Sequence, residues 1–472
     1  MQYSIVRCSE ITSFHSLRLD AEYYHPSYLA IDNTISLKPS KKLSEITKKI
    51  DVGFVGSMTS HYREDGVALL QTKNIESFFV SDSETVKITP SFHNQLKKSQ
   101  VVFEDILIAR SGSFGKASIY LGDSVINSSD IIIIQANNIN PYFLTTFLNS
   151  SLGVNQMIRF ASGGLQGHVN LTILEELKIP TLKTEFQSLI ENILKTSYGL
   201  KEKAKSLYQQ AENLLLEELG LKDWKPKHQL SYVKNYSDTQ HAERFDAEYF
   251  QPQYDEILNK ISILESSHLL DLVEDYSTGY PYKSENYLDE GIPLIRISNI
   301  KKGKLDLTTA AYLSKDYSNV SKKDIAREGN ILISLSGTIG SSALVEKELG
   351  RCCVNQRILS IKVKPSIDKN YLCLLLNSVI GELQLNRIGA GGVQTNISPK
   401  DVFNIQIPIL KPEKQKEISL KIIDSKEKDK QSKSLLEIAK KAVEIAIESN
   451  EEKATKWIDQ ELEKLGVRLS GN

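Results

Sequence analysis

The chain contains 472 residues, of which 40% are hydrophobic and 25% are charged, and its 58 basic and 59 acidic side chains leave a formal net charge of −1. This length predicts about three domains, and the composition is that of a globular protein. The sequence contains no apolar run long enough for a membrane span or a signal peptide, so we expect a cytoplasmic protein. The near-zero net charge does not by itself indicate a nucleic-acid binder, although one basic face would suffice for binding.

The first half of the chain begins with a short acidic and aromatic lead-in segment, residues 1–36, and continues with a globular region, residues 37–183. Within the globular region, residues 101–109 and 125–135 are rich in β-branched side chains and predict strands. Turn residues separate these runs. The pattern favours a mixed domain of short strands and helices.

A long helix is predicted over residues 184–222, where Thr184 and Gln187 have the spacing of a capping box. Its apolar positions advance in alternating steps of four and three residues, which is the heptad pattern of a coiled coil. The positions on this seam are Phe186, Ile190, Ile193, Ser197, Leu200, Ala204, Leu207, Ala211 and Leu214. The small residues among them would let a partner helix approach closely.

The second half of the chain repeats this order. A linker with a second lead-in, residues 223–262, precedes a globular region, residues 263–411, and a C-terminal long helix, residues 412–465. This helix opens at Pro412, a residue favoured in the first turn. Its seam positions are Ile418, Ile422, Ser425, Asp429, Ser432, Leu436, Ala439, Val443 and Ala446. The middle of the seam is polar, which predicts loose packing there or packing against something else.

The two halves are copies of one another. Five segments of the first half recur in the second half in the same order, 225 to 228 residues further on. The matching pairs are residues 18–28 with 244–254, 62–75 with 287–300, 105–115 with 330–340, 143–150 with 371–378, and 162–170 with 390–398. A period of this size indicates a tandem duplication of a domain and not a solenoid.

Both long helices are predicted to run for roughly 35 residues, or about 50 Å, and a helix of this length needs a partner. Each helix could lie on its own domain. An antiparallel pair formed by the two copies explains better why both carry a seam, and we prefer it. The sequence therefore predicts an α+β protein with two tandem α/β domains separated by long helices that pair as an antiparallel coiled coil.

No motif in the sequence indicates a catalytic site, a cofactor or a metal. Residues 111–116 lack the first glycine and the final Ser or Thr of a phosphate-binding loop. Residues 140–143 lack the second proline of the Asn-Pro-Pro-Tyr/Phe motif of amino-methyltransferases. The four cysteines, Cys8, Cys352, Cys353 and Cys373, lack the spacing of zinc ligands, and we expect reduced thiols.

The duplicated loops are instead rich in glycine and polar side chains. Gln and Asn can read an adenine edge with two hydrogen bonds, and Arg can bind phosphate or guanine. Taken alone, such loop residues are more often turn residues, and a surface arginine is more often merely solvated. The candidate DNA-binding residues are Lys73, Arg110, Ser111, Ser113, Arg159, Gln166, His168, Arg296, Lys301, Lys302, Ser336, Thr338, Arg387, Gln394 and Asn396.

The order and duplication of these motifs resemble the specificity subunits of type I restriction–modification systems. The residues that carry the resemblance are Gly291, Arg296, Asn299, Ser336, Gly337, Gly340, Asn377, Ser378, Gly391, Gln394, Asn396, Pro408 and Pro412. The resemblance covers residues 40–220 and 265–450, nearly the whole chain. The first copy is more divergent, with Gln71 in place of Arg296 and His168 in place of Asn396.

The resemblance implies a cytoplasmic DNA-reading subunit of phage defence, without catalytic activity of its own. Each target recognition domain would read one half of a bipartite, asymmetric site in double-stranded DNA. The helices would set the spacing between the halves and recruit two methyltransferase subunits that methylate adenine, and restriction subunits would join them. S-adenosylmethionine, ATP and Mg would then bind to those partner subunits, and this chain would bind no cofactor.

Two other functions remain open at the level of the sequence. The chain could be a stand-alone DNA methyltransferase or nuclease with an unrecognised site, which S-adenosylmethionine binding or DNA turnover by the purified chain would reveal. It could also be a protein-only coiled-coil scaffold. A steep loss of DNA affinity with salt would argue against a scaffold, because phosphate contacts release counterions.

Overall fold

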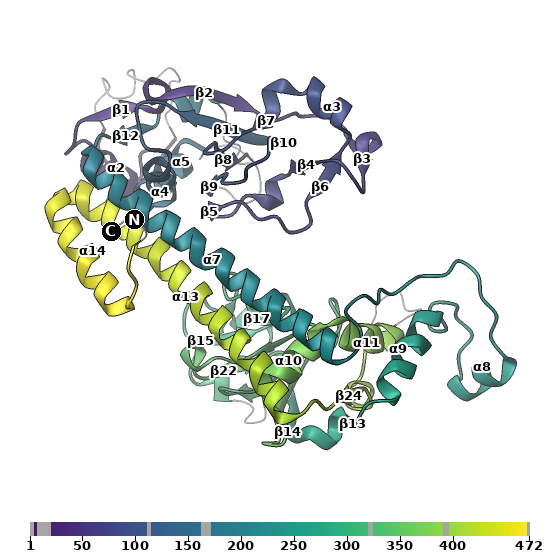
Figure 1. Ribbon diagram of the computed structural model, residues 1–472. Coiled ribbons are helices and arrows are strands. Elements are labelled where there is room, and N and C mark those ends of the chain that lie inside the picture. Colours follow the sequence, from purple (N-terminus) through teal and green to yellow (C-terminus); the bar gives the residue numbers. More distant parts are fainter. Residues whose placement is uncertain are drawn as a thin grey trace. The chain divides into compact units, whose positions relative to one another are not determined.

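The computed structural model describes residues 4–6, 20–110, 115–161, 171–319, 324–389 and 396–469. Contacts divide the chain into two compact units. The first unit comprises Met1–Glu202 and Lys428–Asn472, and the second comprises Lys203–Glu427. Each unit therefore contains one copy of the duplicated domain and a part of each long helix (Figure 1).

The described residues of the first unit form two five-stranded sheets and one two-stranded sheet. One sheet has the order β2 (Thr47–Val52), β11 (Ile131–Ala136), β8 (Ile106–Ala109), β9 (Ala117–Ile119), β5 (Phe78–Phe79). The other has the order β3 (Tyr62–Arg63), β6 (Val86–Ile88), β4 (Val67–Leu70), β10 (Ile126–Ser128), β7 (Gln100–Val101). The pair is β1 (Ser40–Lys42) with β12 (Lys178–Pro180). The helices are α2 (Pro26–Ile35), α3 (Pro90–Gln95), α4 (Pro141–Asn149), α5 (Ser151–Ala161), α6 (Leu171–Glu175) and α14 (Glu451–Leu465).

The second unit repeats this plan with shorter sheets. Its four-stranded sheets are β14 (Val273–Thr278), β23 (Ile358–Val363), β20 (Ile331–Ser334), β21 (Ser342–Leu344), and β18 (Ala311–Leu313), β15 (Ile292–Ile295), β22 (Cys352–Val354), β19 (Ile325–Ala326). The two-stranded sheets pair β13 (Ser266–His268) with β24 (Gln406–Pro408), and β16 (Ile300–Lys301) with β17 (Lys304–Leu305). The helices are α8 (Tyr236–Ala242), α9 (Pro252–Ser262), α10 (Lys369–Asn377), α11 (Val379–Gly389) and α12 (Pro399–Phe403).

The central strands of each unit are buried on both faces. In β11, Ile132 and Ile134 pack in one core with the helices, whereas Ile131 and Ile133 pack in a second core with residues of the other sheet. Successive side chains of a strand point to opposite faces, so a strand between two layers must be apolar throughout. This requirement explains the unbroken β-branched run of residues 131–134 in β11. The two predicted strand segments, residues 101–109 and 125–135, each include residues of two strands that belong to different sheets, β7 and β8 in the first and β10 and β11 in the second.

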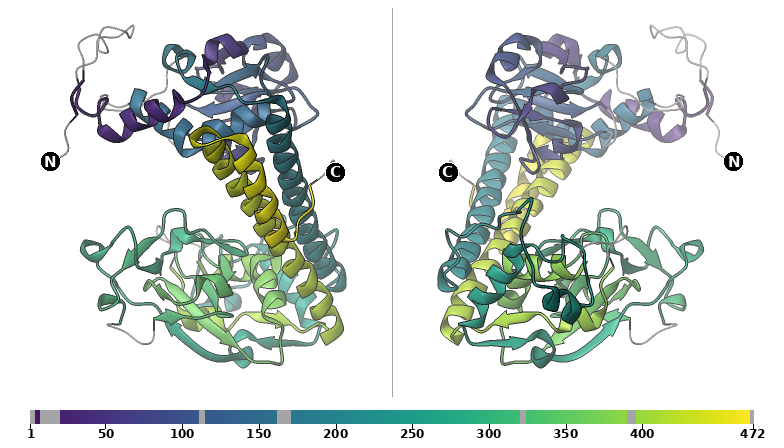
Figure 2. Two further views of the ribbon diagram at one scale, coloured as in Figure 1. Left: turned by 90° about the vertical axis from the view of Figure 1, so that its left-hand side faces the viewer. Right: turned by 90° about the vertical axis from the view of Figure 1, so that its right-hand side faces the viewer.

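The two long helices are α7 (Thr184–Glu218), of 35 residues, and α13 (Pro412–Glu448), of 37 residues. In the first unit, Ser197 Oγ and Ser432 Oγ lie 2.9 Å apart, and Figure 2 shows these parts of α7 and α13 side by side. In the second unit, Ser425 Oγ donates to the carbonyl oxygen of Ala204 at 2.7 Å. Residue numbers rise along α7 as their partners' numbers fall along α13, which confirms the predicted antiparallel pair.

The polar middle of the α13 seam packs tightly, contrary to the looser packing that the sequence suggested. Ser425 and Ser432 are buried, and each donates a hydrogen bond to a backbone carbonyl of α7. Two of the seam positions are corrected. Asp429 is 44% exposed and pairs with Lys433, and Leu435 is fully buried where Leu436 was expected.

The C-terminal segment predicted as one long helix, residues 412–465, consists of two helices in the structure. The helix α13 ends at Glu448, and α14 begins at Glu451. Asn450 has an extended backbone, and its side chain accepts a hydrogen bond from the backbone N–H of Lys453 at 2.9 Å, so it caps α14. Among the described residues, no helix is both long and apolar enough to cross a membrane.

Candidate nucleic-acid interface

Three segments of the second unit meet where β20 ends and β23 begins. The backbone N–H of Leu335 donates to the carbonyl oxygen of Arg357 at 2.9 Å, and that of Ile397 donates to the carbonyl oxygen of Leu335 at 3.0 Å. Ser336 and Asn396 form an isolated antiparallel bridge. These backbone contacts bring Ser336, Arg357 and Asn396 to one surface cluster from three parts of the sequence.

A tight turn places Thr338 at the edge of this cluster. The backbone N–H of Gly340 donates to the carbonyl oxygen of Ser334 at 3.0 Å, and Gly337 and Gly340 have φ values of +72° and +79°. Only glycine adopts such angles freely, which explains the paired glycines of the duplicated motif. A Cβ atom on Gly337 would lie 3.5 Å from Ile297, so the turn lies against the segment that follows Arg296.

Arg357 is the exposed cation of this cluster, and it is not one of the residues predicted from the sequence. Its Nη1 donates to Oδ1 of Asn396 at 3.1 Å. Asn396 is also exposed, so both side chains can reach a ligand. Its position in the duplication could have indicated Arg357. Asp130 directly precedes β11 in the first copy, and Arg357 directly precedes the equivalent strand β23 in the second.

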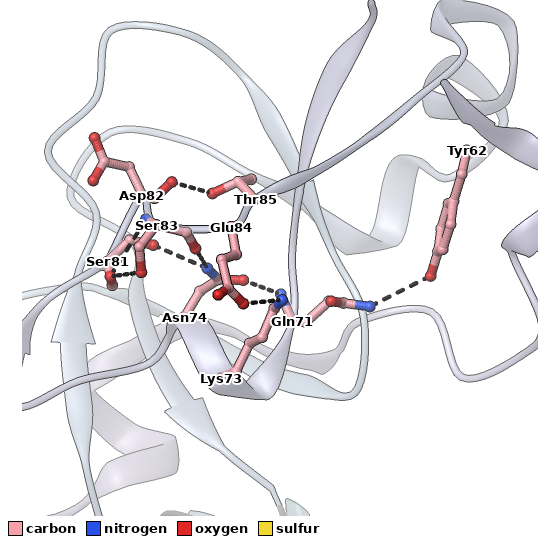
Figure 3. Close-up of polar contacts among 9 residues, drawn as sticks. All are labelled: Tyr62, Gln71, Lys73, Asn74, Ser81, Asp82, Ser83, Glu84 and Thr85. Carbon is pink, nitrogen blue, oxygen red and sulfur yellow. Dashed lines mark hydrogen bonds and ion pairs between the residues drawn. The ribbon is translucent and has the colours of Figure 1, made fainter. Parts of the chain in front are cut away.

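Arg296 and its counterpart Gln71 occupy the same place in the two copies. The backbone N–H of each donates to the side-chain oxygen of an asparagine three residues on, Asn299 or Asn74, at 2.9 Å. Gln71 Nε2 also donates to the Tyr62 hydroxyl at 3.3 Å (Figure 3). The buried asparagines fix the loop, and the residue before the short turn differs between the copies.

In the first unit, Asn74 holds the loop of residues 81–85 against this turn. Its Nδ2 donates to the carbonyl oxygens of Ser81 and Ser83 at 3.1 and 3.0 Å (Figure 3). Lys73, a predicted DNA contact, points toward the same loop and pairs with Glu84 at 3.1 Å. Because the side chains of Lys73 and Glu84 are 48% and 81% exposed, this ion pair contributes little to stability.

Lys301 and Lys302 lie in and beside the short strand β16. Lys302 pairs with Glu382 of α11. Lys301 is exposed and lies near Asp306. Burial disfavours the charged form of Asp306, but hydrogen bonds from Thr308 and the nearby lysines outweigh it and hold the pKa of this carboxyl below its usual value. Each lysine thus has an acidic neighbour.

Arg110 lies directly after β8 and forms an ion pair with Asp130 at 3.3 Å. Both side chains are about one-third exposed, so the pair stands at the surface of the first unit. It occupies the place that corresponds to Leu335 and Arg357 in the second unit.

Arg159 and Arg387 do not belong to an exposed DNA-binding surface, contrary to their selection from the sequence. Arg159 is 5% exposed, and it pairs with Asp32 and lies over the Tyr23 ring at 4.2 Å. Arg387 pairs with Asp255 at 3.2 Å and lies over the Tyr249 ring at 4.7 Å. We therefore assign both arginines a structural role, that of attaching each lead-in segment to its domain.

Five predicted site residues cannot be placed, because they lie outside the described residues: Ser111, Ser113, Gln166, His168 and Gln394. Of the remaining candidates, Ser336, Thr338 and Asn396 lie together with Arg357, and the turn after β20 lies against the segment of Arg296. The residues predicted from the sequence therefore include much of this cluster, but not Arg357, its most exposed cation.

The cysteines of the described ranges are free and buried: Cys352, Cys353 and Cys373. Burial raises the pKa of the Cys352 thiol to about 12 and that of Cys373 to about 11, so both thiols stay protonated at neutral pH. The described part of the chain holds no group of three or more potential metal ligands. The loop cluster of Ser336, Arg357 and Asn396 can therefore bind a ligand through hydrogen bonds and through the charge of Arg357.

The chain contains two copies of one mixed α/β domain, and α7 and α13 form one antiparallel helix pair, of which each unit contains a part. Each copy bears a polar loop surface. These features define a two-domain recognition protein. A family model described as "Type I restriction modification DNA specificity domain" matches residues 36–212 and 264–439, most of the chain. The chain therefore belongs to the family of type I restriction–modification specificity subunits. Its role is DNA sequence recognition, and it is not the catalytic member of such a system.

The curated relatives match either most of the chain or a part of it, at low identity. The MjaVIII specificity subunit of Methanocaldococcus jannaschii is 24% identical over 441 residues, which is 91% of this chain and 92% of that protein. The StySPI specificity subunit of Salmonella potsdam is 31% identical over 147 residues, 29% of this chain and 31% of that protein. A solved S subunit from M. genitalium is 14% identical and covers 92% of this chain and 96% of its own, with a TM-score of 0.40.

Proposed function

We propose that the chain reads a bipartite, asymmetric DNA target and directs adenine methylation and restriction by partner subunits. The observation that carries the proposal is that equivalent loop positions of the two copies bear different side chains. Gln71 corresponds to Arg296, and Asp130 corresponds to Arg357. Two domains with one backbone plan and different polar groups would select different bases, which makes the two halves of the target unlike.

The long helices supply the spacing in this proposal. A helix of 35 residues is about 50 Å long, which is roughly one and a half turns of B-DNA. Two methyltransferase subunits bound to the helices would then each face one half of the target. S-adenosylmethionine, ATP and Mg would bind to the methyltransferase and restriction subunits.

A domain exchange tests the proposal. Residues 40–183 would be replaced by the corresponding domain of another family member, and adenine methylation would be mapped across the genome of cells that make the hybrid with its partner subunits. We expect one half of the methylated motif to change while the other half and the spacing stay the same. A change in both halves, or in neither, would contradict the modular proposal.

A further inference from the structure

The equivalent strand pairs of the two units end in different charge arrangements. In the first unit, Ile131 pairs with Ala109 at the end of the β8–β11 ladder. In the second, Ile358 pairs with Ser334 at the same point of the β20–β23 ladder. The residues just outside are Arg110 and Asp130 in the first unit, but Leu335 and Arg357 in the second. The arginine of the first unit follows β8, whereas that of the second unit precedes β23, the partner strand of β20. The second unit has no aspartate at either of these two positions.

This exchange changes the charge available at the surface. Arg110 is neutralised by Asp130 at 3.3 Å. Arg357 is exposed, and within the described part of the chain its guanidinium has one hydrogen-bond partner, the neutral amide of Asn396. A full positive charge therefore stands at the surface of the second unit, where the first unit has an ion pair.

The backbone around Arg357 is held in place before any ligand binds. Its own carbonyl oxygen accepts a hydrogen bond from Leu335, and its partner Asn396 is bridged to Ser336. The Asn396 amide takes one of the five N–H donors of the guanidinium. A side chain that is already oriented loses less entropy when it binds.

We propose that Arg357 reads a guanine in the half of the target that the second domain contacts, and that Asn396 is the positioning residue of its guanidinium. The proposal rests on the proposed function as a DNA reader. The planar fork of an arginine matches the O6 and N7 acceptors of guanine in the major groove. The donors not used by Asn396 form such a fork, and a lysine cannot replace it because its ammonium lacks the planar geometry.

The experiment selects DNA duplexes from a randomised library with the full chain and its partner methyltransferase subunits, and sequences the bound pool. The variants are Arg357→Ala, Arg357→Lys and Asn396→Ala. Arg327→Ala is the matched control, because it removes an exposed arginine that precedes β20, at the opposite end of that strand. Affinity for one selected duplex is also measured as a function of salt.

For both Arg357 variants, we expect one guanine of one half of the motif to lose its preference, by about tenfold or more, while the other half is unchanged. Asn396→Ala should weaken the same preference to a smaller extent, and Arg327→Ala should leave the motif as it is. The unchanged half of the motif serves as the control for folding.

Two outcomes would overturn the inference alone. If Arg357→Lys selects the wild-type motif while Arg357→Ala weakens all sequences equally and flattens the salt dependence, then Arg357 contacts phosphate and does not read a base. If none of the variants differs from the wild type, then Arg357 does not contact DNA. A wild-type protein that selects no motif would instead overturn the proposed function, and the inference with it.

Discussion

At the scale of single residues, one duplicated contact attaches each lead-in segment to its domain. In both copies an aspartate accepts a hydrogen bond from the backbone N–H of a tyrosine three residues on: Asp20 from Tyr23, and Asp246 from Tyr249, each at 3.0 Å. The ring of that tyrosine lies under the arginine of the following domain. This contact explains why the acidic and aromatic segment recurs in the sequence.

Removal of one partner of the ion pair between Arg159 and Asp32 should destabilise the first unit. In Arg159→Met, Asp32 would remain half-buried without its cation, and we expect a loss of about 3–5 kcal/mol of unfolding free energy. The double variant Arg159→Met with Asp32→Asn removes both charges and should recover part of this loss. Urea denaturation, with hydrogen exchange of α2 and α5 as the local probe, measures both. Equal losses in the single and double variants would contradict the ion-pair explanation.

At the scale of elements, Glu444 of α13 caps the first turn of α5. Its Oε1 accepts hydrogen bonds from the backbone N–H of Ser151 at 2.9 Å and from the Ser151 hydroxyl at 2.6 Å. Burial opposes ionisation of Glu444, but the hydrogen bonds from Ser151 and the nearby Lys441 prevail and lower the pKa of this carboxyl. The helix dipole also favours a carboxylate at this position.

We expect Glu444→Ala to lower the unfolding free energy by about 1–2 kcal/mol at neutral pH. Because the pKa is lower in the folded state, this contribution is complete above the usual glutamate pKa of 4.5 and is lost as the pH falls through the folded-state value. Denaturation of both proteins from pH 7 to pH 3 should therefore show a difference that shrinks toward acid. Glu437→Ala, which changes an exposed glutamate of the same helix, is the control. A difference that is independent of pH would refute the role of the carboxylate.

The serine pair of the helix seam should not tolerate a large side chain. Ser432 Oγ donates to the carbonyl oxygen of Ser197 at 2.8 Å, so α7 and α13 lie close together at this point. We expect Ser432→Leu to cost about 1–3 kcal/mol through overpacking, and Ser432→Ala to cost about 1 kcal/mol for the lost hydrogen bond. Thermal denaturation checks the order of the two variants. If leucine stabilised the protein, the seam would be loosely packed, as its polar composition suggested.

At the scale of the whole molecule, the first unit is built from two separate parts of the chain, whereas the second unit is one continuous segment, Lys203–Glu427. The core of the first unit includes Leu435, Val443, Ala446 and Ile458, although its domain lies before residue 202. A duplicated sequence suggests two independent halves, and the structure instead places a part of each long helix in each unit.

Deletion of residues 428–472 should therefore damage the opposite end of the sequence. We expect α4 and the first part of α7 to lose protection against hydrogen exchange, because their apolar partners on α13 and α14 are absent. The sheets of the second unit should keep their protection, since residues 203–427 remain. Mass spectrometry of exchanged peptides distinguishes the two regions. Equal loss in both units would show that the chain unfolds as one cooperative body.

The sequence predicted the features that depend on local patterns. The duplication and the antiparallel helices follow from repeats and periodicity, and the structure has them. The two segments predicted as strands do contain strands, but the division of residues 101–109 and of residues 125–135 into two strands each was not predicted, because it depends on pairing with distant strands. The roles of Arg159 and Arg357 depend on contacts between distant segments: Asp32 lies 127 residues from Arg159, and Arg357 stands out only once the strand register is known. The interruption at Asn450 was not predicted, although no apolar residue lies between Ile447 and Ala454 and asparagine is a favoured cap residue.

The division of the chain between the two units also determines the order in which the units can fold during synthesis. The core of the first unit extends from Ile35 to Leu469, so it cannot be complete before Leu469 has left the ribosome, whereas the second unit is complete at residue 427. At about 5–20 residues per second, the ribosome needs roughly 10–45 s to make the intervening segment. The domain translated first is thus finished last, and during that interval the apolar residues that α13 and α14 cover in the finished core lack these partners.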